Sequence, residues 1–388
     1  AMWPIIRGGS SWPASVGSAT AALLLAAVIV RLFIPRVWSS PGIRRQVTAS
    51  GTAGGARLPA GSLGWPLLGE TLAFIRAAYS PRPESFVEKR RLRYGKVFKS
   101  HLWGSPAVVS SDPEVSRAVL QADASAFVPW YPRSLMELMG QSSILVLGGG
   151  LQRRVHGLAG AFFKSPQLKA QVTADMQRRV ARAMDAWTRR SDGGAPPVRV
   201  QDEAKSVGIF CTCIYFLPFF DNTGRGISLF VLIFVNVCIC MQEENMELKR
   251  QKSDAGETLE WTDYMSLTFT QQVITETLRM GNIINGIMRK AVRDVEVRGH
   301  LIPKGWRVLV YFRAVHLDAA VHDDPHAFNP WRWKERADLV MSSSGFTPFG
   351  GGQRLCPGLD LARLEASIFL HHLVTSFRYK YRSLLFLS

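Results

Sequence analysis

The chain has 388 residues, of which 47% are apolar and 20% charged, so it can bury a sizeable core and is not intrinsically disordered. Its net charge is +17, from 47 Lys and Arg against 30 Asp and Glu. The basic residues are spread along the chain, so an anionic membrane surface or an acidic protein partner explains the excess, and nucleic-acid binding ranks last. The five cysteines form no secretory disulfide framework, which predicts reduced thiols in a cytosol-facing domain.

The N-terminal segment predicts a membrane anchor. From Ala14 to Ile34 the only charged residue is Arg31, and the run approaches the ~20 residues that cross a bilayer. Arginines are more frequent after this run than before it, which keeps the downstream chain cytosolic by the positive-inside rule. A cleaved signal peptide is the alternative, but its positive charges would precede the apolar run. We expect a lumenal stub over residues 1–13 and a transmembrane signal anchor over residues 14–38.

A linker and a large domain follow the anchor. Residues 39–69 combine a Gly/Ala/Ser-rich stretch with a dense run of prolines and glycines from Leu58 to Gly69, which predicts a stiff hinge. The remaining residues, 70–388, are predicted to form one folded domain.

The first part of this domain mixes strands and helices. Val97 to Val109 alternates well enough for two short strands around a turn at Gly104-Ser105-Pro106. Asp112 and Pro113 form a good cap and first turn for a helix that runs to about Gln121, and a further helix begins near Gln152.

The middle of the chain is strongly apolar. Residues 207–241 carry four of the five cysteines among Ile, Phe, Leu and Val, namely Cys211, Cys213, Cys238 and Cys240. Two Cys-x-Cys pairs suggest a metal site, but no His is nearby, so we do not predict zinc binding. Residues 227–241 are also shorter than a usual membrane span. We interpret 207–241 as a divergent insert.

Two patterns follow this insert. Residues 257–280 read as a helical region in which Glu276 and Arg279, three residues apart, share one face and can form an ion pair. Residues 299–310 predict a β-hairpin that turns at Pro303-Lys304-Gly305.

The most informative stretch is Phe346 to Gly358. It places Cys356 at the end of a glycine-rich loop, just before a predicted helix with apolar residues at helical spacing. The helix dipole and Arg354 are expected to lower the pKa of the Cys356 thiol and favour the thiolate. Three consecutive glycines let the backbone approach a flat, bulky group, so the loop fits the axial thiolate ligand of a haem iron. A buried structural cysteine is the alternative.

These residues resemble those of a known family. The loop matches the haem-binding signature FxxGxRxCxG of the cytochromes P450 at Phe349, Gly352, Arg354, Cys356 and Gly358. The Glu276-x-x-Arg279 pair and the later Arg332 resemble further family signatures and occur in the family's order. The resemblance implies a mainly α fold with small β-sheets, the cytochrome P450 fold.

The chain departs from the family in two places. The family's central oxygen-activating helix carries an Ala/Gly-Gly-x-x-Thr pattern, and no such pattern occurs between Arg153 and Gln242. The expected fold is therefore incomplete, and the acid/Thr pair that would be catalytic is not assigned to any residue. The stretch after Phe377 also lacks the family's final β-hairpin.

The resemblance implies a role for each matching residue. Cys356 is the metal ligand, which binds the iron of haem b, and a structural triad of Glu276, Arg279 and Arg332 supports the cysteine loop. The other expected cofactor-binding residues contact the haem or its propionates: Phe349, Gly352, Arg354, Gly358, Arg289, Arg154 and His156. For Arg154 and His156 a solvated basic turn is the alternative, because the family's usual tryptophan is missing there. Residues 282–287 are expected to line the substrate side.

The amino-acid sequence of several segments resembles that of plant brassinosteroid hydroxylases, which act on the steroid side chain at C-22 or C-23. This implies a monooxygenase of the endoplasmic reticulum membrane, single-pass with a cytosolic domain, that uses O₂ and electrons from NADPH through an NADPH–cytochrome P450 reductase. The expected partners are this reductase, a steroid and membrane lipid, with no nucleic acid. The alternative is a catalytically inactive or misspliced P450-derived membrane protein that lacks the oxygen-activating helix.

Overall fold

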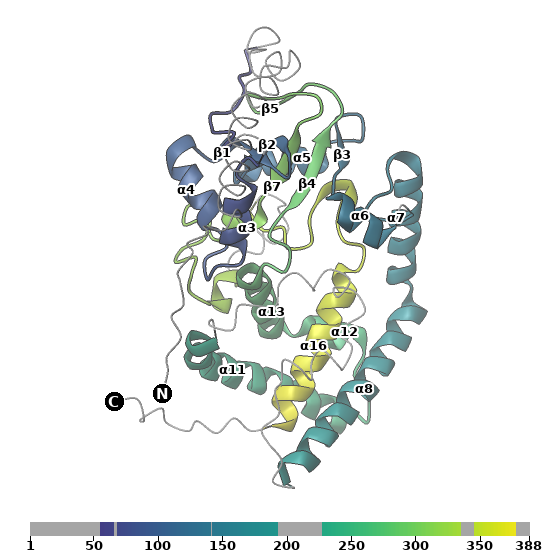
Figure 1. The fold of residues 1–388 in the computed structure, drawn as a ribbon. Coiled ribbons are helices and arrows are strands. Elements are labelled where there is room, and N and C mark those ends of the chain that lie inside the picture. The colour runs from purple at the N-terminus through teal and green to yellow at the C-terminus, as the bar shows by residue number, and fades with distance from the viewer. Residues whose placement is uncertain (1–54, 66–67, 141, 193–226, 335–344, 378–388) are drawn as a thin grey trace, which may run out of the picture.

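The computed structural model describes residues 55–65, 68–140, 142–192, 227–334 and 345–377. A β-rich region lies at one end of the molecule and a group of helices at the other (Figure 1). The predicted anchor, the first part of the linker, and Cys211 and Cys213 fall outside the described residues. None of the described helices is both long and apolar enough to cross a membrane.

The larger sheet has five strands in the order β1-β2-β7-β4-β3. They are β1 (Val97–Leu102), β2 (Ser105–Ser110), β3 (Phe127–Pro129), β4 (Ile287–Ala291) and β7 (Arg307–Val310). The predicted strand pair is confirmed, since β1 and β2 run antiparallel, and β2 pairs with β7 in parallel. The turn lies at Trp103 and Gly104, which both have positive φ.

The hairpin predicted over residues 299–310 is wrong. Strand β6 (His300–Ile302) pairs antiparallel with the strand before it, β5 (Val295–Val297), whereas β7 joins the larger sheet. The tight turn is at Arg298 and Gly299, whose φ values of 49° and 78° are those that a two-residue hairpin turn requires. The turn at 303–305 passes the chain from one sheet to the other, with Gly305 N–H donating to the Ala291 carbonyl at 2.8 Å.

Helices make up most of the described chain, which confirms the mainly α prediction. They are α3 (Thr71–Ala78), α4 (Ser85–Tyr94), α5 (Pro113–Gln121), α6 (Arg133–Met139), α7 (Gly149–Lys164), α8 (Pro166–Asp192), α11 (Ile227–Asp254), α12 (Trp261–Ser266), α13 (Thr268–Gly281), α14 (Phe312–His316) and α16 (Leu359–Ser376), with short 3₁₀ turns η2 (Pro330–Trp333) and η3 (Gly352–Arg354).

Local sequence signals explain several helix boundaries. The Asp112 carboxylate accepts from Val115 N–H at 2.9 Å and caps α5 as predicted, with Pro113 in the first turn. The helical region predicted over residues 257–280 divides into α12 and α13 at Leu267.

The helical core fixes α16, the helix that follows the cysteine loop. Its residues Leu364 and Ile368 are fully buried in one cluster with Met184 and Trp187 of α8 and Tyr264 of α12. In Figure 1, α16 runs beside α8, from the β-rich end towards the far end of the helices. The start of α16, and therefore the end of the cysteine loop, is held by apolar packing.

We predict that Leu364→Ala lowers the unfolding free energy by roughly 2–5 kcal/mol, because it opens a cavity in this fully buried cluster. Urea unfolding followed by circular dichroism measures the change. The matched control is Leu92→Ala on α4, where the side chain is 84% exposed and little change is expected. Equal effects of the two substitutions would contradict the assigned core.

Candidate active site

The cysteine loop is a series of tight turns between the β-rich region and α16. Cys356 N–H donates to the Phe349 carbonyl at 3.1 Å, and Gly350 N–H donates to the Thr347 carbonyl at 3.1 Å. Gly352 has a φ of 64°, and a side chain there would collide with the Leu120 carbonyl at the end of α5. Glycine is therefore required at this position both by backbone conformation and by space.

Cys356 itself is half-buried and lies three residues before α16. Burial raises the pKa of its thiol, although a hydrogen bond from Gly358 N–H opposes the shift. The expectation that this pKa is lowered is wrong, because the Arg354 guanidinium points elsewhere and donates to the Leu145 and Leu147 carbonyls. A thiol that binds a metal is deprotonated by the metal itself, so the raised pKa does not oppose ligation.

A buried carboxylate joins α13 to η2, the 3₁₀ turn that precedes the cysteine loop in the chain. Glu276 is fully buried and accepts from Arg279 at 2.9 and 2.8 Å and from Arg332 at 3.1 Å. Trp333 Nε1 and Asn329 N–H each donate to it at 2.9 Å. Burial alone would raise the pKa of Glu276, but these hydrogen bonds and the two guanidinium charges hold it below its usual range. The structure thus brings together the three residues of the expected triad.

Arg279 extends this network toward the loop. Its remaining donors reach the carbonyls of His316, Pro325 and Ala327 at 2.9, 2.7 and 3.1 Å. A buried arginine whose donors are all occupied is fixed in place, so it holds α13 against the chain that precedes η2.

A second chain of hydrogen bonds ends on the loop itself. Asn282 caps α13 in a left-handed conformation, and its Oδ1 lies 2.6 Å from Nδ1 of His316. Thr347 N–H donates to His316 Nε2 at 2.9 Å, so Nδ1 must carry the proton. The prediction that Asn282 lines the substrate side is therefore wrong, because its side chain is buried in this chain of contacts.

Two arginines, the buried Arg289 and the half-buried Arg354, line one cavity. Among the described residues neither Arg289 nor Arg354 forms an ion pair, although Asp123 also lines the cavity of about 170 Å³ that both arginines face. Burial lowers the pKa of Arg289 to about 10, and the charge of Arg354 adds to this shift. Tyr131 lies beside Arg289 and is hydrogen-bonded to it. Two guanidinium groups that face one cavity and have only neutral hydrogen-bond partners favour an anionic ligand, which fits the propionates of a haem.

The residues expected from α7 occupy different environments. Arg154 is exposed and makes no hydrogen bond or ion pair with any described residue. A ring nitrogen of His156 lies 2.6 Å from the Leu355 carbonyl of the cysteine loop. Their contact with a propionate stays a prediction. Gln152, which no sequence signal singled out, is buried and donates to the Gln353 carbonyl at 3.1 Å.

Two polar residues of α11, Glu244 and Asn245, face other helices. The Glu244 carboxylate accepts from Phe269 and Thr270 N–H at 2.8 and 2.9 Å and caps α13. Asn245 bonds to Thr270 and His371. Neither residue provides the family's acid/Thr pair, so no catalytic residue is assigned.

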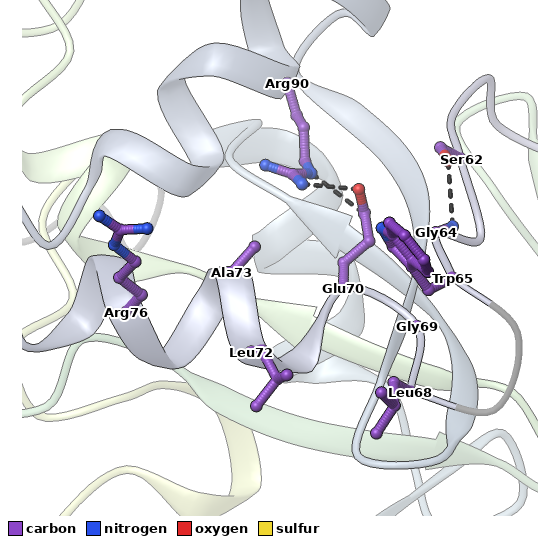
Figure 2. A pocket seen from close by; sticks show the side chains of 10 residues that line it. All are labelled: Ser62, Gly64, Trp65, Leu68, Gly69, Glu70, Leu72, Ala73, Arg76 and Arg90. Atoms are coloured by element: carbon purple, nitrogen blue, oxygen red, sulfur yellow. Dashed lines mark hydrogen bonds and ion pairs between the residues drawn. The ribbon is translucent and has the colours of Figure 1, made fainter. Parts of the chain in front are cut away.

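A larger hollow of about 910 Å³ lies beside α3, at the end of the predicted hinge (Figure 2). Trp65, Leu68 and Leu72 line it and are 78%, 58% and 64% exposed. Beside them Glu70 accepts from Arg90 Nη2 at 2.6 Å, which ties the start of α3 to α4.

We predict that Glu276→Gln lowers the unfolding free energy by about 3–5 kcal/mol, because it leaves two buried guanidinium groups without their counter-charge. Urea unfolding measures this. Glu137→Gln, which removes an exposed ion pair with Arg133, serves as the control and should change little. A similarly small effect of Glu276→Gln would show that the buried network does not need the charge.

The stability of the fold should also fall as the pH falls below about 6.5. Burial lowers the pKa of His316 to about 3, so the folded chain keeps it neutral where the unfolded chain protonates it. The unfolded state then binds one proton more, and the unfolding free energy drops by about 1.4 kcal/mol per pH unit from this residue alone. Unfolding of wild type and His316→Gln between about pH 6.5 and 5 measures it. An unchanged slope in the variant would contradict the assignment.

Comparisons with known proteins show which proteins the chain resembles. Residues 240–384 match the family model described as Cytochrome P450. The chain is 54% identical to Cytochrome P450 90D2 of Brachypodium distachyon, over 96% of this chain and 90% of that protein. It is 42% identical to 3-epi-6-deoxocathasterone 23-monooxygenase CYP90D1 of Arabidopsis thaliana, over 88% of this chain and 89% of that protein.

Among solved structures, retinoic acid bound cyanobacterial CYP120A1 shares the fold, with a TM-score of 0.63 and 20% identity over 82% of this chain and 92% of that one. The alignment with Cytochrome P450 90D2 runs over 477 positions against 388 residues here, so at least 89 positions have no counterpart in this chain. At these identities and coverages, the chain belongs to the cytochrome P450 family.

Proposed function

We propose that this chain is a haem-thiolate monooxygenase that hydroxylates the side chain of a brassinosteroid precursor. The observation that carries the proposal is the 42% identity, over most of both chains, to a relative named as a steroid 23-monooxygenase. A second relative from Arabidopsis thaliana, 39% identical, bears the name 3-epi-6-deoxocathasterone 23-monooxygenase CYP90C1. These names favour C-23 over C-22 as the oxidised carbon.

The haem would bind at the cysteine loop, with Cys356 on the iron. The charges of Arg289 and Arg354, which line one cavity, suit its propionates. Phe349 and Gly358 lie on either side of Cys356 and help to fix its backbone. The Phe349 carbonyl accepts a hydrogen bond from Cys356 N–H, and Gly358 is the N-cap residue of α16. Bound haem supplies the oxygen-activating chemistry, and the residues of the chain hold it in one orientation.

The electrons would come from NADPH through a cytochrome P450 reductase, to which a chain of net charge +17 can present a basic face. The same charge suits an anionic membrane surface.

We place the chain in the endoplasmic reticulum membrane, anchored by residues 14–38 with its folded domain in the cytosol. The exposed Trp65, Leu68 and Leu72 at the end of the hinge support contact with lipid, since tryptophan favours the boundary between headgroups and acyl chains.

The test is NADPH-dependent oxidation of 3-epi-6-deoxocathasterone by the full chain in membranes with a plant reductase. We expect a product with one added oxygen at C-23, located by mass spectrometry and NMR. Cys356→Ala should abolish the product and also the absorption band of the ferrous–CO complex that is typical of thiolate-ligated haem. A wild-type chain that shows this band and makes no hydroxylated steroid would contradict the proposed reaction while leaving the haem assignment intact.

A further inference from the structure

The hollow beside α3 combines an apolar wall with a positive charge (Figure 2). Trp65, Leu68 and Leu72 form the apolar part, and Arg76 lines the hollow from the last turn of α3. In Figure 2, Trp65 and Arg76 lie at opposite ends of the lining. The volume of about 910 Å³ is typical of a ligand site. A ligand that fits this lining would have both an apolar and an anionic part.

The other two charged residues of the lining neutralise each other. Arg90 donates to the Glu70 carboxylate from Nε at 3.0 Å and from Nη2 at 2.6 Å. The Ser100 hydroxyl donates to the same carboxylate at 2.6 Å. The Arg90 guanidinium also lies over the Phe86 ring, 3.5 Å from its centroid. The carboxylate that lines the hollow is therefore already compensated.

Arg76 differs from Arg90 in its environment. Its side chain is exposed, and it forms no hydrogen bond or ion pair with any residue that the structure describes. The two arginines and one glutamate of the lining leave one positive charge, which Arg76 carries. A guanidinium group matches the oxygens of a phosphate with two parallel hydrogen bonds, so this end of the hollow suits a phosphate.

Helix α3 presents apolar side chains to solvent as well as to the core. Phe74 and Ala77 pack in the core. Leu72, Ile75 and Tyr79 are exposed, and their three- and four-residue spacing places them on one face of the helix. An exposed apolar face beside a basic residue is typical of a helix that lies in the headgroup region of a membrane. This face favours a lipid over a small soluble anion.

The position of the hollow in the chain favours the same ligand. Trp65 and Leu68 belong to the hinge, which follows the predicted anchor over residues 14–38. A site tethered to a bilayer meets lipid at a high effective concentration, so even a weak site is occupied.

We propose that the hollow beside α3 binds one anionic phospholipid, with its phosphate on Arg76 and the first part of its acyl chains against Trp65, Leu68 and Leu72. A zwitterionic headgroup carries a cation close to its phosphate, which Arg76 repels, so the site selects a lipid of net negative charge. The inference rests on the proposed membrane location and on no property of the haem or the steroid. It assigns a headgroup charge and the residue that selects it.

The experiment uses the full chain loaded with haem, in a non-ionic detergent. Native mass spectrometry measures the binding of phosphatidylglycerol and of phosphatidylcholine with the same acyl chains, and hydrogen–deuterium exchange of residues 68–79 reports binding at α3. Arg76→Gln removes the charge, and Leu72→Ser removes part of the apolar wall. The matched control is Arg117→Gln on α5, since Arg117 is also exposed and has no ion pair with a described residue.

We expect wild type to bind phosphatidylglycerol about fivefold more tightly than phosphatidylcholine, with slower exchange of residues 68–79. Arg76→Gln should lose this preference, Leu72→Ser should weaken the binding of both lipids, and Arg117→Gln should match wild type. Inorganic phosphate at the concentration of the lipid should not displace it, because phosphate lacks the apolar part.

Three results would overturn the proposal. In the first, wild type binds the two lipids equally or the preference survives Arg76→Gln. In the second, the exchange of residues 68–79 does not change with lipid. In the third, inorganic phosphate displaces the lipid, which would make the hollow a simple anion site. These measurements need no steroid, so absent steroid turnover leaves them untouched, and a failed lipid site leaves the proposed hydroxylation and the predicted anchor in place.

Discussion

The burial of one carboxylate constrains the rest of this structure. Glu276 has no contact with water, so its charge must be satisfied by protein groups alone. Arg279 supplies two hydrogen bonds from the same helix, while Asn329, Arg332 and Trp333 come from η2 and the residue before it. The ionised carboxylate therefore fixes α13 against η2, and the donors that Arg279 has left fix the backbone around His316 and Ala327.

The cysteine loop is fastened to this framework at both ends and along its side. Thr347 at its start bonds to His316, and its end runs into α16, which is buried among α8 and α12. Between these ends, Gly352 lies against the Leu120 carbonyl, and α7 exchanges hydrogen bonds with residues 353–355. A ligand held by a buried, satisfied polar network and by apolar packing keeps one geometry, which is what a metal centre requires of its protein.

Two of the failed predictions depended on neighbours that are distant in sequence. The turn at 303–305 has suitable residues for a hairpin, but the positive φ values of Arg298 and Gly299 place the tight turn earlier, and β7 finds its partners in β2 and β4. The pKa of Cys356 was expected to fall because of Arg354, yet the guanidinium is held by carbonyls at 145 and 147, and burial dominates.

The sequence by itself determined the features that depend on local spacing. These include the cap of α5 by Asp112, the three-residue separation of Glu276 and Arg279, and the glycine-rich loop ending in Cys356 before a helix. The tertiary structure alone decided which groups meet that loop. Gln152, Asn282 and His316 carry no signal in their own neighbourhoods, because a buried polar side chain acquires its role only from the partner that folding places beside it.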